Sequence, residues 1–147
     1  MFQFKYQSEI IINAPKKKVW EVLSDFPSYK KWNPFTVQID SSLELGSEVF
    51  LTVKMKPDKN TTIRTEYLKA YDPEEKMVWG FDHGLVLKAE RTQRLISIDE
   101  KTTRYENEDK ISGLASPLVQ ILYGKWIQRG FDSLCIALKS YIENGKP

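Results

Sequence analysis

Residues 86–112 read VLKAERTQRLISIDEKTTRYENEDKIS. Along residues 86–98 and again along residues 103–112, charged side chains recur at nearly every second position. The turn Asp99-Glu100-Lys101 lies between the two runs. Alternation with a period of two predicts β-strands, because successive side chains of a strand point to opposite faces of a sheet. A turn this short pairs the strands antiparallel. The stretch therefore predicts two long neighbouring strands of an antiparallel sheet.

One face of each of these strands is nearly all charged, so we expect it to lie in water and the other face to point inward. The charged face carries Lys88, Glu90, Thr92 and Arg94 in the first strand and Arg104, Glu106, Glu108 and Lys110 in the second. The inward face then carries Leu87, Ala89, Arg91, Gln93 and Leu95, followed by Tyr105, Asn107, Asp109 and Ile111.

The same period of two predicts five further strands on the N-terminal side of this pair. They span residues 3–13, 35–41, 47–55, 61–71 and 76–82, and turn residues such as Leu45-Gly46 and Asp72-Pro73 separate them. In the last of them we expect Met77, Trp79 and Phe81 to face inward. Residues 61–71 allow two assignments. We favour Ile63, Thr65 and Tyr67 as the inward set, because it leaves Arg64 and Glu66 in water.

Helical signals occur after the first strand and at the C-terminal end. Pro15 suits the first turn of one short helix, and Pro27 can open a second that runs through Trp32. Ser116 as a cap and Pro117 at the first position predict a long helix over residues 117–143. Its apolar face is expected to contain Val119, Leu122, Trp126, Leu134, Leu138 and Tyr141.

The order is strand, two helices, six strands and a long helix, which predicts an α+β fold with a curved seven-stranded antiparallel sheet around the C-terminal helix. A sheet that curves round one helix can leave a space that side chains do not fill. We expect an apolar lining for that space from Met77, Trp79, Phe81, Leu87, Leu95, Leu122 and Trp126. A polar spot within it is predicted from Arg91, Gln93, Tyr105, Asn107 and Asp109.

Arg91 and Asp109 are the charged members of that spot, and buried charges are costly unless they are paired. One interpretation is an ion pair across adjacent strands that serves the fold alone. In that case Asp109→Asn should destabilise the protein. The other interpretation is that one or both side chains orient a polar group of a ligand.

Composition limits the possible functions. The 147 residues fit a single domain, and a net charge of +2 with no strong basic cluster argues against a nucleic-acid partner. One histidine and one cysteine exclude a multi-histidine metal site and an internal disulfide, and we expect no metal and no cofactor. Without an apolar signal core or a membrane-length apolar stretch, we expect a cytoplasmic protein without stable membrane insertion. The oligomeric state cannot be read from the sequence.

Several segments resemble one family across the chain. Residues 29–35, YKKWNPF, are similar to the Tyr-x-x-Trp-Asn-Pro-Phe signature of the START-like (SRPBCC) superfamily, in its polyketide cyclase/dehydrase-like branch. Residues 14–25 resemble the family's opening helix, and Leu45-Gly46-Ser47 and Ile111-Ser112-Gly113 match later positions. The resemblance implies one domain over residues 1–147, a helix-grip fold and a hydrophobic cavity. It does not imply one reaction.

Three functional hypotheses follow. The first is binding or carrying of a hydrophobic small molecule (a lipid, polyketide or aromatic compound), and we favour it over catalysis. The second is a cyclase or dehydratase that uses Asp109, Arg91 or Tyr105 for proton transfer. The third is a protein- or membrane-interaction module, which predicts a filled core and an exposed apolar patch. We also count Trp32, Tyr67 and the turn residue His83 as candidate ligand contacts.

Overall fold

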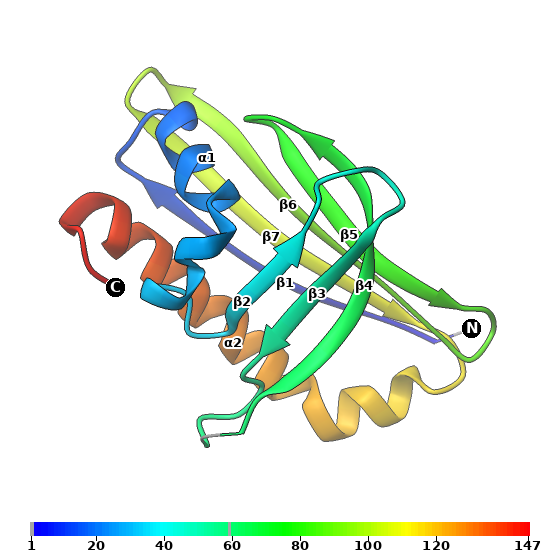
Figure 1. The fold of residues 1–147 in the computed structure, drawn as a ribbon. Helices are drawn as coiled ribbons and strands as arrows, with labels where there is room; N and C mark the ends of the chain where they lie inside the picture. The colour runs from blue at the N-terminus through cyan, green and yellow to red at the C-terminus, as the bar shows by residue number, and fades with distance from the viewer. Residues whose placement is uncertain (1, 59) are drawn as a thin grey trace.

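The computed structural model describes residues 2–58 and 60–147, in which seven strands form one antiparallel sheet (Figure 1). Their order across the sheet is β1-β7-β6-β5-β4-β3-β2. Each strand from β2 to β6 therefore lies beside its successor, as expected for short turns. The strands are β1 (Gln3–Ile12), β2 (Thr36–Ser41), β3 (Glu48–Val53), β4 (Thr62–Asp72), β5 (Lys76–His83), β6 (Leu87–Asp99) and β7 (Thr102–Ser112).

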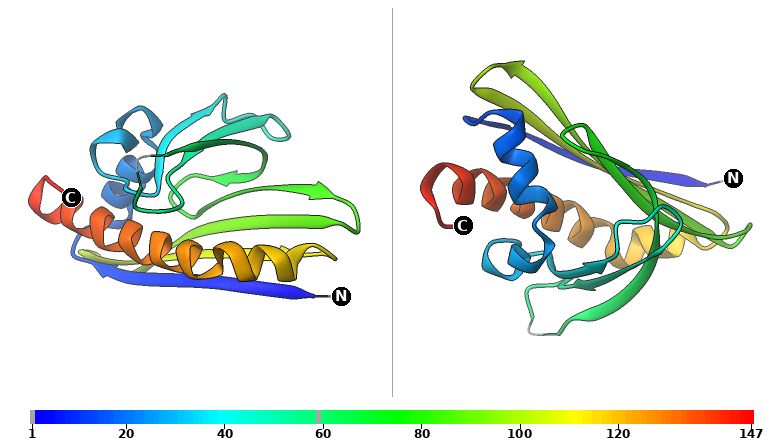
Figure 2. Two further views of the ribbon diagram at one scale, coloured as in Figure 1. Left: turned by 90° about the horizontal axis from the view of Figure 1, so that it is seen from below. Right: turned by 45° about the horizontal axis from the view of Figure 1, so that its top comes forward.

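Three helical segments complete the fold: α1 (Lys16–Ser24), the short 3-10 helix η1 (Phe26–Lys31) and the long α2 (Ser116–Asn144). Helix α2 has 29 residues and is about 43 Å long at about 1.5 Å per residue. Figure 2 shows the sheet curling from β1 on one side of α2 to β2–β4 on the other. This is the predicted α+β helix-grip architecture. No helix in the described part of the chain combines the length and apolarity needed to span a membrane.

Local irregularities bend the sheet. The register shifts between Leu68 and Ala70 in β4 and between Ser97 and Asp99 in β6, and such bulges increase strand bending and twist. At Gly80 the strands β5 and β6 approach so closely that a Cβ atom would lie 2.1 Å from the Ala89 carbonyl oxygen. Only glycine fits there without moving the backbone.

Aromatic side chains fill one end of the space between the sheet and α2. The Trp32 ring lies edge-on to Tyr29 at 4.9 Å and stacks on Tyr141 of α2 at 6.3 Å, measured between ring centroids. Phe26 lies edge-on to Tyr29 at 5.5 Å. Trp32 is thus a buried core residue that holds η1 against α2, and its predicted position in the ligand space is wrong.

Strand β4 turns the opposite face inward from the one we favoured. Ile63 is 75% exposed and Tyr67 is 47% exposed, whereas Glu66 is 8% and Leu68 is 2% exposed. Tyr67 therefore lies on the outer face. The sequence argument sent the charged side chains into water, but in the fold the inner face of β4 borders a cavity where Arg64 and Glu66 meet other polar groups.

Helix α2 buries Leu134 and Leu138 as predicted, but its first half is turned away from the predicted orientation. Its side toward the cavity carries Val119, Tyr123, Ile127 and Phe131, which recur every four residues. Leu122 is 49% exposed, so its predicted inward position is wrong. The first half of α2 is apolar nearly all round, so the spacing of its apolar residues did not fix the inward side.

The start of α2 differs in one detail from the predicted cap. Ala115 occupies the cap position, and Pro117 lies in the first turn as expected. Ser116 is the first helical residue, and its hydroxyl donates to the Gly113 carbonyl oxygen at 2.7 Å. Ser116 thus ties the helix to the preceding turn.

Candidate functional site

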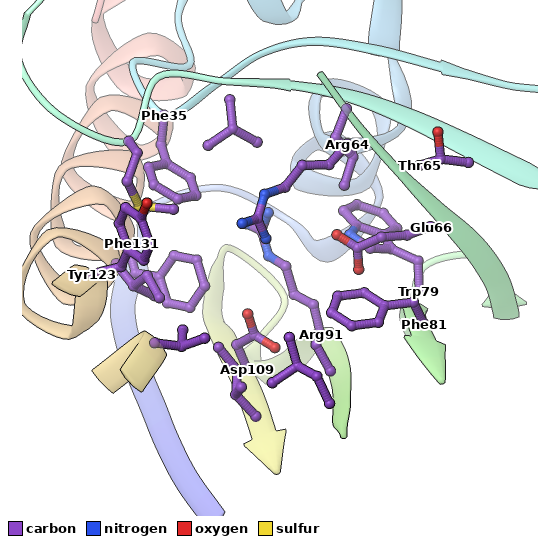
Figure 3. A pocket seen from close by; sticks show the side chains of 18 of the residues that line it. Phe35, Arg64, Thr65, Glu66, Trp79, Phe81, Arg91, Asp109, Tyr123 and Phe131 are labelled. Atoms are coloured by element: carbon purple, nitrogen blue, oxygen red, sulfur yellow. The ribbon is translucent and has the colours of Figure 1, made fainter. Parts of the chain in front are cut away.

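A cavity of about 350 Å³ lies between the concave face of the sheet and the first half of α2 (Figure 3). Most of its lining is apolar, and this part comes from β3, β5, β6, β7, α2 and the segments next to β2 and β3. The apolar and aromatic lining residues are Phe35, Leu51, Val53, Met55, Trp79, Phe81, Leu87, Ala89, Ile111, Val119, Tyr123, Ile127 and Phe131.

The solvent-exposed members of the lining mark the opening of the cavity. They are Arg64 and Thr65 on β4, His83 at the end of β5 and Tyr123 on α2. Exposed aliphatic side chains neighbour this opening in sequence: Leu85, Val86, Leu118 and Leu122. The interaction-module hypothesis expected such an apolar patch, but it also expected a filled core, and here the core contains a cavity.

Arg91 crosses the inner face of β6 and is held by neutral partners. Its Nε donates to Asn107 Oδ1 at 2.9 Å, and its Nη1 donates to Thr36 Oγ1 at 3.2 Å. Its guanidinium carbon lies 4.9 Å from the Phe131 ring centroid and 5.5 Å from that of Trp79. Cation–π attraction to both rings helps to fix this side chain, which is only 6% exposed.

Asp109 is the cross-strand neighbour of Arg91 on β7, yet no ion pair joins the two side chains in the part of the chain that the structure describes. The Asp109 Oδ1 is buried and has no hydrogen-bond partner within residues 2–58 and 60–147. Burial raises the pKa of Asp109 from 3.8 to about 6, although the positive charges of Arg91 and Arg64 act against this shift. The interpretation as a structural ion pair is therefore wrong.

Glu66 brings a second carboxyl group to the same cavity. Burial, together with the charge of Asp109, raises the pKa of Glu66 from 4.5 to about 7, against the opposing effect of Arg91 and Arg64. In Figure 3 the side chains of Arg64, Glu66, Arg91 and Asp109 point toward the same space. The cavity thus has an apolar wall and one charged cluster built from β4, β6 and β7.

The other members of the predicted polar spot lie behind this cluster and do not line the cavity. The Tyr105 hydroxyl donates to Gln93 Oε1 at 2.5 Å, and both residues are buried. Burial raises the pKa of Tyr105 well above 10.0. Asn107 holds Arg91 through its Oδ1. Asn107 thus positions Arg91, and the predicted placement of all three residues in the cavity wall is wrong.

The structure thus separates the candidate residues into two groups, and Met77 and Leu95 belong to the buried core and not to the lining. The six that line the cavity are Trp79, Phe81, His83, Leu87, Arg91 and Asp109. Trp126 lies instead in an outer groove, with the ammonium of Lys125 at 4.9 Å and the guanidinium of Arg129 at 5.1 Å from its ring centroid. Sequence reasoning missed Arg64 and Glu66 as cavity residues. They share one face of the strand with the apolar Leu68, and this face was the alternative inward assignment.

A seven-stranded sheet that grips a long helix over a mainly apolar cavity defines the START-like class of proteins. Residues 3–143 match the family described as "Polyketide cyclase / dehydrase and lipid transport", and the chain belongs to this family. The resemblance seen in the sequence is confirmed. No curated protein matches the sequence.

Solved structures with the same fold have little sequence in common with this chain. A START superfamily protein from Mycobacterium smegmatis is 15% identical, with a TM-score of 0.70 over 97% of this chain and 99% of the other. The Zhui aromatase/cyclase from Streptomyces is 13% identical, with a TM-score of 0.69 and 98% of both chains covered. Norcoclaurine synthase from Thalictrum is 14% identical, with a TM-score of 0.69 over 99% and 98% of the two chains. At these identities the likeness shows the fold alone.

Proposed function

We propose that this protein binds one hydrophobic small molecule in the cavity between the sheet and α2. The observation that carries the proposal is the cavity itself, about 350 Å³ in volume and mainly apolar. Small-molecule sites occupy about 300–1,000 Å³ and combine apolar walls with a few polar groups. The family description, which includes lipid transport, is in keeping with this role.

Apolar burial supplies the driving force for such binding. A ligand here would contact Val53, Ile111 and Ile127, and each square ångström of apolar surface removed from water contributes about 25 cal/mol. The four charged side chains occupy one region of the lining, so a ligand with an apolar body and one polar end fits best.

A pair of neighbouring substitutions on α2 tests this proposal. Val119 lines the cavity, whereas Leu118 is exposed and does not. Val119→Trp should fill part of the cavity and weaken binding of the uncharged fluorescent probe N-phenyl-1-naphthylamine by about tenfold or more, which corresponds to about 1.4 kcal/mol. Leu118→Trp is the matched control and should bind the probe like the unchanged protein. Equal affinities in all three proteins, or no saturable binding in any, would contradict the proposal.

A second candidate function is proton transfer to or from the bound molecule. It is favoured by an inward carboxyl group, Asp109, that has no structural partner among the described residues. A carboxyl group with a pKa of about 6 is mostly ionised at neutral pH and can act as a general base. The family description, which names polyketide cyclases, suggests a polyketide as the trial substrate. Equal product formation by the unchanged protein and by Asp109→Asn would exclude this role.

A further inference from the structure

We infer that the molecule held in the cavity carries one anionic group, such as a carboxylate, which binds between Arg91 and Arg64. This inference rests on the proposed binding function and specifies the chemistry of its ligand. It is drawn from the charges that line the cavity and from the partners that those charges lack.

The charges of the cavity differ in whether they can be neutralised. The titratable groups of its lining are Arg64 and Glu66 on β4, His83 on β5, Arg91 on β6, Asp109 on β7 and Tyr123 on α2. An apolar ligand that displaces water makes every unpaired charge more costly. The two carboxyl groups can respond to the loss of water by taking up a proton, because burial raises the pKa of both. Arginine cannot lose its proton under these conditions. The positive charge is therefore the part that a ligand must neutralise.

Both arginines have donors to offer. Arg91 uses two of its five N–H groups, on the neutral oxygens of Asn107 and Thr36. Within residues 2–58 and 60–147, Arg64 forms no hydrogen bond through its side chain and no ion pair. Figure 3 shows the two side chains approaching the middle of the cavity from β4 and β6.

The two arginines differ in depth, which gives the site a direction. Arg91 is buried between aromatic rings, and Arg64 is exposed at the opening. An anion that contacts both would sit on the charged side of the cavity, and its apolar body would lie against Val53, Ile111 and Ile127. Planar guanidinium groups bind carboxylates with paired hydrogen bonds, so the geometry suits a carboxylate well.

The test compares three compounds with the same ten-carbon chain: decanoate, decan-1-ol and decylamine. Each is used to displace N-phenyl-1-naphthylamine from the protein at about pH 7.5, where the acid is ionised and the amine is protonated. Decanoate should bind about tenfold more tightly than the alcohol, as expected for hydrogen bonds to a charged group, and the amine should bind most weakly.

Two single-charge variants link the preference to the cavity. Arg64→Gln removes the exposed arginine of the site and should reduce the affinity for decanoate by about tenfold while leaving that for the alcohol unchanged. Arg94→Gln removes an arginine from the outer face of β6 and should change neither affinity. Equal binding of acid and alcohol, tighter binding of the amine, or equal effects of both variants would overturn the anionic ligand and leave the binding function intact. If neither the probe nor any of the three compounds binds, the binding function itself fails.

Discussion

Asp109→Asn is expected to stabilise the fold at about pH 8 by about 3 kcal/mol. The pKa of Asp109 is raised from 3.8 to about 6, chiefly by burial, and each unit of that shift corresponds to about 1.4 kcal/mol. An ionised carboxylate in this position therefore opposes folding. The neutral amide keeps the shape of the side chain and removes the charge.

The pH dependence gives this prediction its sign. A carboxyl group whose folded pKa is raised binds protons more tightly in the folded state than in the unfolded state. The contribution of Asp109 to stability should therefore fall as the pH rises from about 4 to about 6, and its cost should stay constant above that range. Denaturant unfolding of both proteins at about pH 3 and about pH 8 measures the effect. The variant should gain stability only at the higher pH. A loss of stability there would contradict this prediction and support the ion pair between Arg91 and Asp109 that the sequence suggested.

Phe131→Ala should cost about 3–5 kcal/mol of unfolding free energy, the usual range for removing a buried phenyl ring. The Phe131 side chain is 1% exposed, and its ring lies edge-on to Phe35 at 5.5 Å between centroids. It also covers the guanidinium of Arg91 at 4.9 Å. Its removal enlarges the cavity and takes one aromatic face from a buried cation.

The matched control for this variant lies on the outer side of the same helix. Ile136 is 65% exposed, so Ile136→Ala should change the unfolding free energy by less than about 0.5 kcal/mol. Urea unfolding followed by circular dichroism measures both variants. Similar losses in the two would show that Phe131 does not hold α2 and Arg91 in place.

The sequence predicted the fold well because strand alternation is strong where one face is charged. In β6 and β7 the charged outer face identifies the inner one. The inward orientation predicted for Ala89, Arg91 and Tyr105 was correct. Strand β4 was assigned to the wrong face because both of its faces carry polar side chains. The polarity of the side chains alone could not decide whether Tyr67 or Glu66 faces inward.

The candidate site was harder to predict because its details depend on contacts between distant segments. Arg91 and Asp109 are opposite each other on the adjacent strands β6 and β7, and sequence reasoning paired them. In the fold Thr36, 55 residues away, offers Arg91 another partner. The position of Thr36 depends on how β2 closes over the sheet, which no local pattern contains.

The central claim is that a single hydrophobic molecule occupies the cavity, and methyl NMR tests it most directly. During titration with N-phenyl-1-naphthylamine, the methyl signals of the lining residues Val53, Ile111 and Ile127 should shift and saturate at one equivalent. The signals of Ile63 and Ile136, on the outer surface, should stay in place. Shifts confined to the outer methyl groups, or no saturable shift at the lining residues, would contradict the account.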